Sequence, residues 1–335
     1  MLNKHISMSS SNLRVRLYKL EDSEVWDKLV VESWNGTFLH TRRFLSYHCE
    51  RFQDISLVIE DSSGQMIGVF PAAIDPAKQD RAISHPGITY GGIVHNGKVR
   101  GTVMVKVLHL ISETYQKIGV CTLRYKTVPY IYHRVPASDD LYALFRLEAV
   151  RYRCDLCSTI DLDSQVRLSR GRTQALKKAR NAGVCIKYGT KYLEEFWQIL
   201  EENKKKYGVK PIHSWQEIQY LYSLFPDNIE IVVGVLNNQV VAGAVLFKTD
   251  QVIHPQYGAA SLEGYTICAL DLIYQHCIEK SKSARVRYFD FGISNENEGH
   301  YLNESLDEFK SMFGGRGVVH EFYEINLKPG GRNED

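Results

Sequence analysis

Three side chains in the second half of the chain are of types that could move a proton or hold a charge. His254 lies in QVIHPQY, Asp290 in YFDFGIS and Lys310 in LDEFKSMFGG. An imidazole titrates near neutral pH and suits a general base, although it could equally be tied into a sheet edge. A carboxylate could orient such a base, hold an amine or pair with a local basic residue. The ammonium of Lys310 could meet that carboxylate or a ligand phosphate, or extend harmlessly along a helix face. We take these three as candidate catalytic residues.

Two predicted strands would carry the histidine and the aspartate. The strand 251–260 contains Pro255, which cannot donate a ladder hydrogen bond, so we expect it to be unpaired or bulged there. A gap in a sheet leaves backbone groups to which a ligand can bind. The strand 286–294 ends in SNENEGHYLNE, whose polar residues are typical of an exposed loop that presents functional groups.

A helix that follows this loop would carry the lysine. Asn303 can cap it, and Gly314-Gly315 can end it. Lys310 falls about 60° from the centre of the apolar stripe at about 100° per residue. The stripe consists of Leu302, Leu306, Phe309 and Phe313.

The order of the elements is repeated at a separation of about 170 residues. Each copy reads as helix, strand, strand, extended His-Pro segment, helix and strand. The paired segments begin at Trp26 and Trp197, and continue through 55–74 and 229–247, His85-Pro86 and His254-Pro255, 103–118 and 266–282, and 121–128 and 286–294. A helical stretch over 141–152 is predicted to separate the copies. We therefore expect a polar lead 1–12, domains 13–160 and 161–330, and a tail 331–335.

Six segments of the second copy carry a resemblance to a known family. They are KPIHS (210–214), HPQYGAAS (254–261), ALDLIY (269–274), YFDFGIS (288–294), LNESLDEFKSMFGG (302–315) and HEFYEINL (320–327). The order of their elements resembles the GNAT acyltransferase fold. The doubled arrangement resembles the Fem aminoacyltransferases and the GNAT-like proteins found with bacterial cell-surface polysaccharide genes. The resemblance implies an α/β (α+β) protein of two tandem GNAT-like domains, each with a mixed, mostly antiparallel sheet flanked by helices.

The resemblance also implies a reaction, the attack of an amine on an activated acyl carbon. Such a reaction needs a deprotonated amine, a donor for the developing oxyanion and close placement of the reactants. The leading hypothesis is an N-acyltransferase that moves an acyl group, expected to be acetyl, from acyl-CoA to an amine of an amino sugar or nucleotide-linked precursor of surface polysaccharide. One alternative is a Fem-like enzyme that uses aminoacyl-tRNA. Another is a non-catalytic binding module on a decayed GNAT fold.

The resemblance places the site where the strands 251–260 and 286–294 separate at one end. In GNAT enzymes the pyrophosphate of acyl-CoA binds backbone amides of a glycine-rich turn at a helix start. Here that turn, LEGYTICAL, has a single glycine, and the predicted cofactor-binding residues are Gly264, Tyr265 and Ala269. The predicted substrate-binding residues are Gln256, Tyr257, Ser261, Ser294, Asn303, Glu304, His213, Ser214, His85 and Tyr90.

The composition limits the partners. A net charge of +2 gives no bulk attraction to duplex DNA, so a basic patch must be local. One basic run, 167–191, is either a solvated helix face or a docking surface for a phosphorylated ligand such as aminoacyl-tRNA.

The seven scattered cysteines favour a reducing compartment over a disulfide framework. The spacing Cys154-Asp155-Leu156-Cys157 lacks the further ligands of a zinc site, so no metal is expected. Without an evident signal peptide or membrane span, we expect a cytoplasmic protein.

Overall fold

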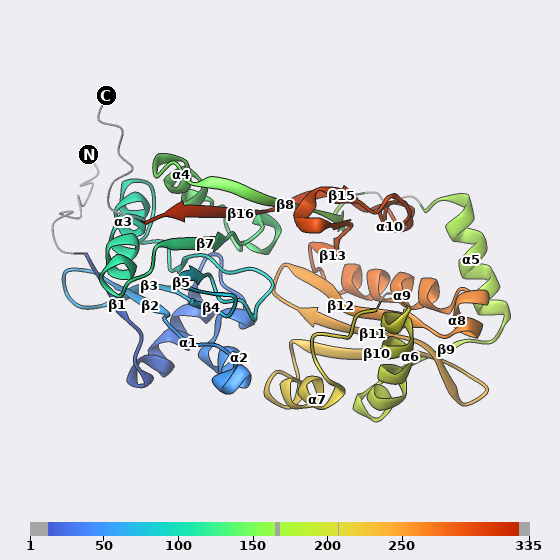
Figure 1. Ribbon diagram of the computed structural model, residues 1–335. Helices are drawn as coiled ribbons and strands as arrows, with labels where there is room; N and C mark the ends of the chain where they lie inside the picture. The colour runs from blue at the N-terminus through green and yellow to red at the C-terminus, as the bar shows by residue number, and fades with distance from the viewer. Residues whose placement is uncertain (1–12, 165–167, 207, 328–335) are drawn as a thin grey trace, which may run out of the picture. The chain divides into compact units, whose positions relative to one another are not determined.

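The computed structural model describes residues 13–164, 168–206 and 208–327, which form two compact units (Figure 1). Unit 1 consists of residues 13–154 and 320–327, and unit 2 of residues 155–319. The chain passes between the units within β8 (Val150–Asp161) and again within β16 (Arg316–Asn326). The expected domains 13–160 and 161–330 differ from these units, because the C-terminal strand pairs inside unit 1. The expected lead and tail lie outside the described residues.

Unit 1 contains two groups of strands. The first is four-stranded in the order β1-β2-β3-β6, and in the second β5 lies between β4 and β7, which also pairs with β16. The strands are β1 (Arg14–Leu17), β2 (Leu57–Glu60), β3 (Met66–Phe70), β4 (Ala73–Asp75), β5 (Lys78–Ile83), β6 (Val94–His95) and β7 (Thr122–Lys126). The predicted hairpin 55–74 is confirmed by the antiparallel pairing of β2 with β3.

The described α-helices of unit 1 are α1 (Ser23–Glu32), α2 (Arg42–Leu45), α3 (Thr102–Lys117) and α4 (Asp139–Arg146). The longest of them, α3, shares a core cluster with α4. The apolar side chains of α3 recur at helical spacing and are fully buried in the same cluster as Leu57 of β2 and Leu123 of β7. Ile325 of β16 belongs to that cluster as well, so the returning strand completes the core.

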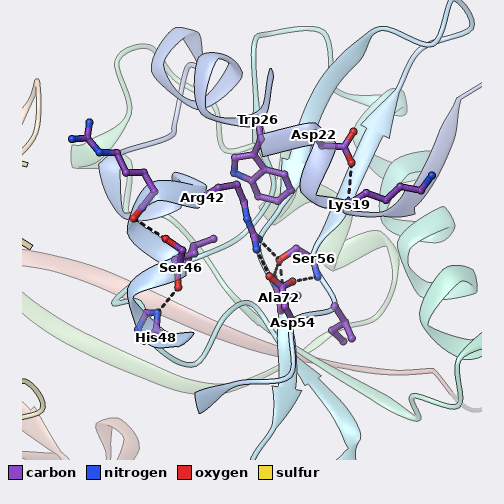
Figure 2. A network of polar contacts seen from close by, with 12 residues as sticks. Lys19, Asp22, Trp26, Arg42, Ser46, His48, Asp54, Ser56 and Ala72 are labelled. Atoms are coloured by element: carbon purple, nitrogen blue, oxygen red, sulfur yellow. Dashed lines mark hydrogen bonds and ion pairs between the residues drawn. The ribbon is translucent and has the colours of Figure 1, made fainter. Parts of the chain in front are cut away.

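A polar network fastens α2 to the loop before β2. The Arg42 guanidinium lies over the Trp26 ring at 5.2 Å from its centroid, forms an ion pair with Asp54 and donates to the Ser56 hydroxyl at 3.1 Å (Figure 2). The cation therefore has both an aromatic face and hydrogen-bond acceptors, which compensates for its partial burial.

Unit 2 contains a mixed sheet in the order β8-β13-β12-β11-β10-β9. Its strands are β9 (Cys185–Tyr188), β10 (Ile229–Leu236), β11 (Gln239–Lys248), β12 (Val252–Ala260) and β13 (Tyr288–Ile293), with the short pair β14 (Asn295–Glu296) and β15 (Tyr301–Leu302) beside it. Its helices are α5 (Arg170–Asn181), α6 (Leu193–Lys205), α7 (Trp215–Leu224), α8 (Leu262–Thr266), α9 (Ala269–Ser283) and α10 (Glu304–Ser311).

Helices cover both faces of this sheet. On β11, Gly243 approaches the Phe196 ring of α6, whereas Ala242 and Ala244 belong to the core cluster that contains Ile273 of α9. Since neighbouring residues of a strand point to opposite faces, α6 and α9 lie on opposite sides of the sheet. The predicted hairpin 229–247 and the predicted element order of this copy are confirmed.

The predicted helical stretch 141–152 is wrong in its second half. Helix α4 ends at Arg146, Glu148 has a φ of 54°, and β8 begins at Val150. The first residues of β8 belong to a strand that lies beside β16, and the Tyr152 ring packs edge-on against Phe322 of β16 with centroids 6.3 Å apart. These contacts with a distant part of the sequence outweigh the helical spacing of the apolar residues. No helix within the described ranges is long and apolar enough to cross a membrane.

Candidate active site

The strands β12 and β13 are paired at one end only. They run parallel with two residue pairs, Val252 with Tyr288 and Ile253 with Phe289, and the pairing stops there. Next to this point the register of β12 against β11 shifts, which leaves Gln256 as the extra residue of a bulge. The expectation of an unpaired or bulged strand near Pro255 is therefore confirmed, and an open end of the sheet lies beside it.

A second bulge lies in β13, on the other side of this opening. Asp290 pairs with Thr159 of β8 and Ile293 pairs with Cys157, so β13 contains one more residue than its partner between these points. Gly292 occupies the bulge with a φ of 71°, a conformation that favours glycine. A Cβ at Gly292 would lie 2.8 Å from Cε1 of His254, so the absent side chain also makes room for the imidazole.

His254 and Asp290 form a hydrogen-bonded pair in this opening. The imidazole Nδ1 lies 2.8 Å from the Asp290 backbone oxygen and 3.6 Å from its carboxylate Oδ2. Because both oxygens are acceptors, Nδ1 must carry a proton and Nε2 of a neutral ring keeps its lone pair. The His254 side chain is 19% exposed, so part of the imidazole is open to solvent.

The Asp290 carboxylate is buried and held by further donors. Oδ1 accepts from the Thr159 hydroxyl at 2.9 Å and from the Gly292 amide at 3.0 Å. Burial acts to raise the pKa of Asp290, but the contacts with His254, Gly292 and Thr159 outweigh it and hold the pKa below its usual value. Asp290 is therefore an ionised group that orients His254.

Lys310 reaches the same bulge from α10. Its buried Nζ donates to the backbone oxygen of Gly292 at 2.9 Å and to that of Ile293. Burial lowers the pKa of Lys310 to about 8, although the nearby Asp290 charge acts in the opposite direction. The structure thus brings the three candidate catalytic residues together, and the ammonium can supply positive charge near the opening.

The predicted contacts around α10 have local structural roles. Ser294 is buried, with its hydroxyl 3.1 Å from that of Ser158. Asn303 accepts from the Leu306 amide at 3.1 Å, which confirms the predicted cap, and it also donates to Glu296. Glu304 is exposed in the first turn.

The predicted cofactor turn is packed closely on the sheet. A Cβ at Gly264 would lie 2.0 Å from the Val241 backbone oxygen, so close packing of α8 is sufficient to require the glycine. Its amide donates to the capping hydroxyl of Ser261 at 3.1 Å. Tyr265 is 55% exposed, whereas the Ala269 side chain is in the core and leaves only its backbone for a ligand. A role in cofactor binding stays a prediction for these residues.

A third group of predicted residues surrounds the Tyr257 hydroxyl. His213 Nδ1 lies 2.6 Å from this hydroxyl, and burial raises the pKa of Tyr257 to about 12. The Tyr257 ring also packs edge-on against Trp197, with centroids 5.0 Å apart. The neighbouring Ser214 forms a capping box with Glu217 at the start of α7.

His85 and Tyr90 are both engaged inside unit 1. The His85 backbone oxygen accepts from Lys126 Nζ at 2.7 Å, and burial lowers the pKa of the His85 imidazole well below its usual value. The Tyr90 hydroxyl donates to Thr37 at 3.2 Å.

The basic run contains one residue that is not at the surface. Arg172 is buried, forms an ion pair with Asp271 and stacks over Phe313 at 4.1 Å, so it ties α5 to α9 and to the end of α10. This residue does not belong to a docking surface. The exposed cations of the described part of the run are Arg170, Lys177, Lys178, Arg180, Lys187 and Lys191, while Arg167 lies outside it.

Cys154 and Cys157 do not form half of a metal site. They are three positions apart on β8, so their side chains point to opposite faces.

Sequence reasoning missed Thr159 and Gly292 as parts of the site. Thr159 belongs to no motif and reaches Asp290 only through the pairing of β8 with β13, whereas Gly292 lies within YFDFGIS but was given no role. A glycine two residues after a strand aspartate was the available signal for the bulge.

Comparison with known proteins bears on the fold of unit 2. Residues 167–310 match the family model of the acetyltransferase (GNAT) domain. This part of unit 2 is therefore similar to a GNAT acetyltransferase domain. No curated protein matches the chain in sequence.

Solved structures extend the likeness to the whole chain. FemX is 10% identical, with 93% of this chain and 97% of FemX covered at a TM-score of 0.66. A tandem GNAT protein from the clavulanic acid biosynthesis pathway is 12% identical, with 95% and 100% covered at 0.55. The C-terminal domain of a putative lysylphosphatidylglycerol synthetase from Agrobacterium fabrum is 11% identical, with 80% and 83% covered at 0.55. These identities show the fold alone, and they confirm the predicted tandem GNAT-like architecture.

Proposed function

We propose that the protein is an N-acyltransferase whose reaction centre is the opening between β12 and β13. His254 Nε2 removes a proton from the acceptor amine, and the amine nitrogen attacks the acyl carbonyl carbon. A C–N bond forms, the bond to the donor's leaving group breaks, and the proton passes to that leaving group. Lys310 stabilises the negative charge that develops on the carbonyl oxygen.

One observation carries this proposal. A partly exposed imidazole is oriented by a buried, ionised aspartate beside a buried lysine, at the one place where the paired strands β12 and β13 separate. A structural role of these groups alone would not require the imidazole to stay partly exposed.

The donor that we propose is acyl-CoA, with acetyl as the expected group. The GNAT domain match supports it, since that family model is of an acetyltransferase. The acceptor that we propose is an amine of an amino sugar or of a nucleotide-linked precursor of surface polysaccharide. The support for that acceptor class is the resemblance of segments such as HPQYGAAS and YFDFGIS to the GNAT-like proteins found with cell-surface polysaccharide genes.

Aminoacyl-tRNA is the second candidate donor. Two observations favour it, the close packing of Gly264 against Val241 in the turn expected to bind pyrophosphate, and the exposed cations of α5 and β9. Guanidinium and ammonium groups on one surface suit a polyphosphate backbone.

We also propose a reducing, cytoplasmic compartment, which the seven free cysteines support.

The test measures binding and turnover separately. Acetyl-CoA and aminoacyl-tRNA are titrated against the purified full chain, and product is measured with each donor and a panel of amino sugars. His254→Gln should lower kcat by about 10²- to 10⁴-fold without loss of donor affinity. The matched control is His276→Gln, which changes an imidazole of α9 bonded to Tyr188 and should leave kcat unchanged. Saturable binding of ligands without product from any donor would instead indicate a binding module.

A further inference from the structure

Two buried polar atoms beside the proposed reaction centre have no hydrogen-bond partner among the described residues. They are Nε1 of Trp197 in α6 and Oε1 of Gln256 in β12. Trp197 is 1% exposed, so its N–H has no access to bulk solvent. An unpaired buried donor or acceptor costs free energy, and folded proteins rarely leave one without a reason.

Both residues belong to one cluster around Tyr257. The Trp197 ring packs edge-on against the Tyr257 ring, and the Gln256 side chain contacts the Tyr257 hydroxyl. Gln256 is also the bulged residue, two positions after His254 on β12. The two unpaired atoms therefore belong to residues that both contact Tyr257, and one of them is on the strand that carries the proposed base.

The rest of the cluster is already satisfied. The Tyr257 hydroxyl lies 3.3 Å from the His213 backbone N–H, which donates to it, and 2.6 Å from His213 Nδ1. What the cluster can still offer to a ligand is one donor on Trp197 and one acceptor on Gln256.

The repeated architecture supplies an internal comparison. Trp26 occupies the equivalent position in α1, and its fully buried indole N–H donates to the His40 backbone oxygen at 2.8 Å. Figure 2 shows Trp26 within the polar network of unit 1. In the first copy the indole N–H is thus paired with a backbone carbonyl. In the second copy the equivalent N–H is buried and has no partner among the described residues.

We propose that Trp197 and Gln256 form a subsite for a secondary amide of the acyl acceptor. The amide oxygen accepts from Trp197 Nε1, and the amide N–H donates to Gln256 Oε1. A carboxylate would face the lone pairs of Gln256, and an ammonium would face the indole N–H, so neither fits both atoms. This inference rests on the proposed function, because it places the amide on the acceptor.

Two kinds of acceptor contain such a group, an N-acetylated sugar and a peptide. Matched ligand pairs separate them in calorimetric titrations of the full chain. The sugar pair is UDP-N-acetylglucosamine and UDP-glucose. The peptide pair is N-acetylglycine N-methylamide and methyl acetoxyacetate, in which ester oxygens replace both amide N–H groups. We expect the wild-type protein to prefer the amide member of one pair by about five- to tenfold, the effect of a pair of neutral hydrogen bonds.

Two variants tie that preference to the subsite. Trp197→Phe keeps an aromatic ring and removes the donor, and Gln256→Met keeps the approximate length and removes the acceptor. Each should reduce the preference to about one- to twofold. The control Trp26→Phe should lower the urea midpoint, because it leaves the His40 oxygen unpaired, but should not change the preference. Gln256→Met keeps the test valid if Trp197→Phe does not fold.

The outcomes separate this inference from the proposed function. His254→Gln should lower kcat by about 10²- to 10⁴-fold and keep the amide preference. A preference without turnover from any donor would contradict the proposed function and support the subsite. The subsite proposal is wrong if neither amide ligand binds at millimolar concentration, or if the wild-type protein shows no preference for the amide member of either pair. It is also wrong if the amide preference persists in both variants, which is the result expected if an ordered water fills the position.

Discussion

Asp290 shows how a single residue depends on its own strand and on two other strands. Its carboxylate receives hydrogen bonds from Thr159 on β8 and from the Gly292 amide, and it faces His254 on β12. Alternation along YFDFGIS predicts that the acid needs a partner, but not which one. The partner comes from strand pairing, which short-range patterns do not specify.

Replacing Asp290 with Asn should weaken both stability and activity. The amide keeps the shape but loses the charge, so we expect about 1–3 kcal/mol lower stability at neutral pH, together with a lower kcat. The pKa of Asp290 is lowered in the fold, so its contribution is present above the unfolded value of about 4 and is lost as pH falls through the folded value. Urea midpoints measured from pH 7 to pH 3 should converge for the two proteins. A difference that stays constant over this range would contradict an ionised Asp290.

Lys310 should set the alkaline limit of the reaction. Its pKa of about 8 means that the ammonium is lost as pH rises through that value, so kcat should fall on the alkaline side. Lys310→Met should lower kcat by about 10²- to 10³-fold and should remove this alkaline decrease. The exposed Lys282 supplies the control, since Lys282→Met should reproduce the wild-type profile. An unchanged alkaline limb in Lys310→Met would assign it to another group.

At the scale of elements, two bulges create the site. The bulge at Gln256 and the bulge at Gly292 flank the point where β12 and β13 stop pairing. Pro255 predicts the first of them, because a missing N–H is visible in the sequence. The second depends on a positive φ and on the approach of His254, which only the folded backbone reveals.

Gly292→Ala tests the second bulge. The new Cβ combines a left-handed backbone with a 2.8 Å contact to His254, so we expect a loss of about 1–2 kcal/mol from the backbone alone and a displaced imidazole with lower kcat. Gly119→Ala is a matched control, because Gly119 has a φ of 85° and no atom within 4 Å of its Cβ. The control should lose stability and keep kcat. Equal kcat values in the two variants would show that the bulge does not position His254.

At the scale of the whole molecule, the repeated element order is predictable and the exact path of the chain is not. The matched tryptophans, hairpins and helices reveal two copies. They do not reveal that β16 returns to unit 1, because its apolar alternation fits any sheet edge. Nor do they show that β8 replaces the second half of a predicted helix, since its neighbours in the sheet, β16 and β13, are more than a hundred positions away in sequence.

Ile325→Ala tests the membership of β16. The side chain is 4% exposed in the core of unit 1, so its truncation should cost about 2–5 kcal/mol there. Hydrogen exchange followed by mass spectrometry should show faster exchange in α3 and β7, with protection kept in β10 and β11. Val245→Ala in β11, a milder truncation, should show the reverse distribution. If Ile325→Ala instead lost hydrogen-exchange protection only in unit 2, β16 would belong to the core of unit 2.

The two chain crossings also set an order of events during synthesis. The ribosome makes the residues of unit 2 between the first part of unit 1 and the strand that completes it. Unit 2 can fold as soon as it emerges, whereas β7 must wait with an unpaired edge until residues 322–326 arrive. The proposed reaction centre in unit 2 can therefore form before unit 1 is complete. During that interval the unpaired edge of β7 is the part of the nascent chain that a chaperone would protect.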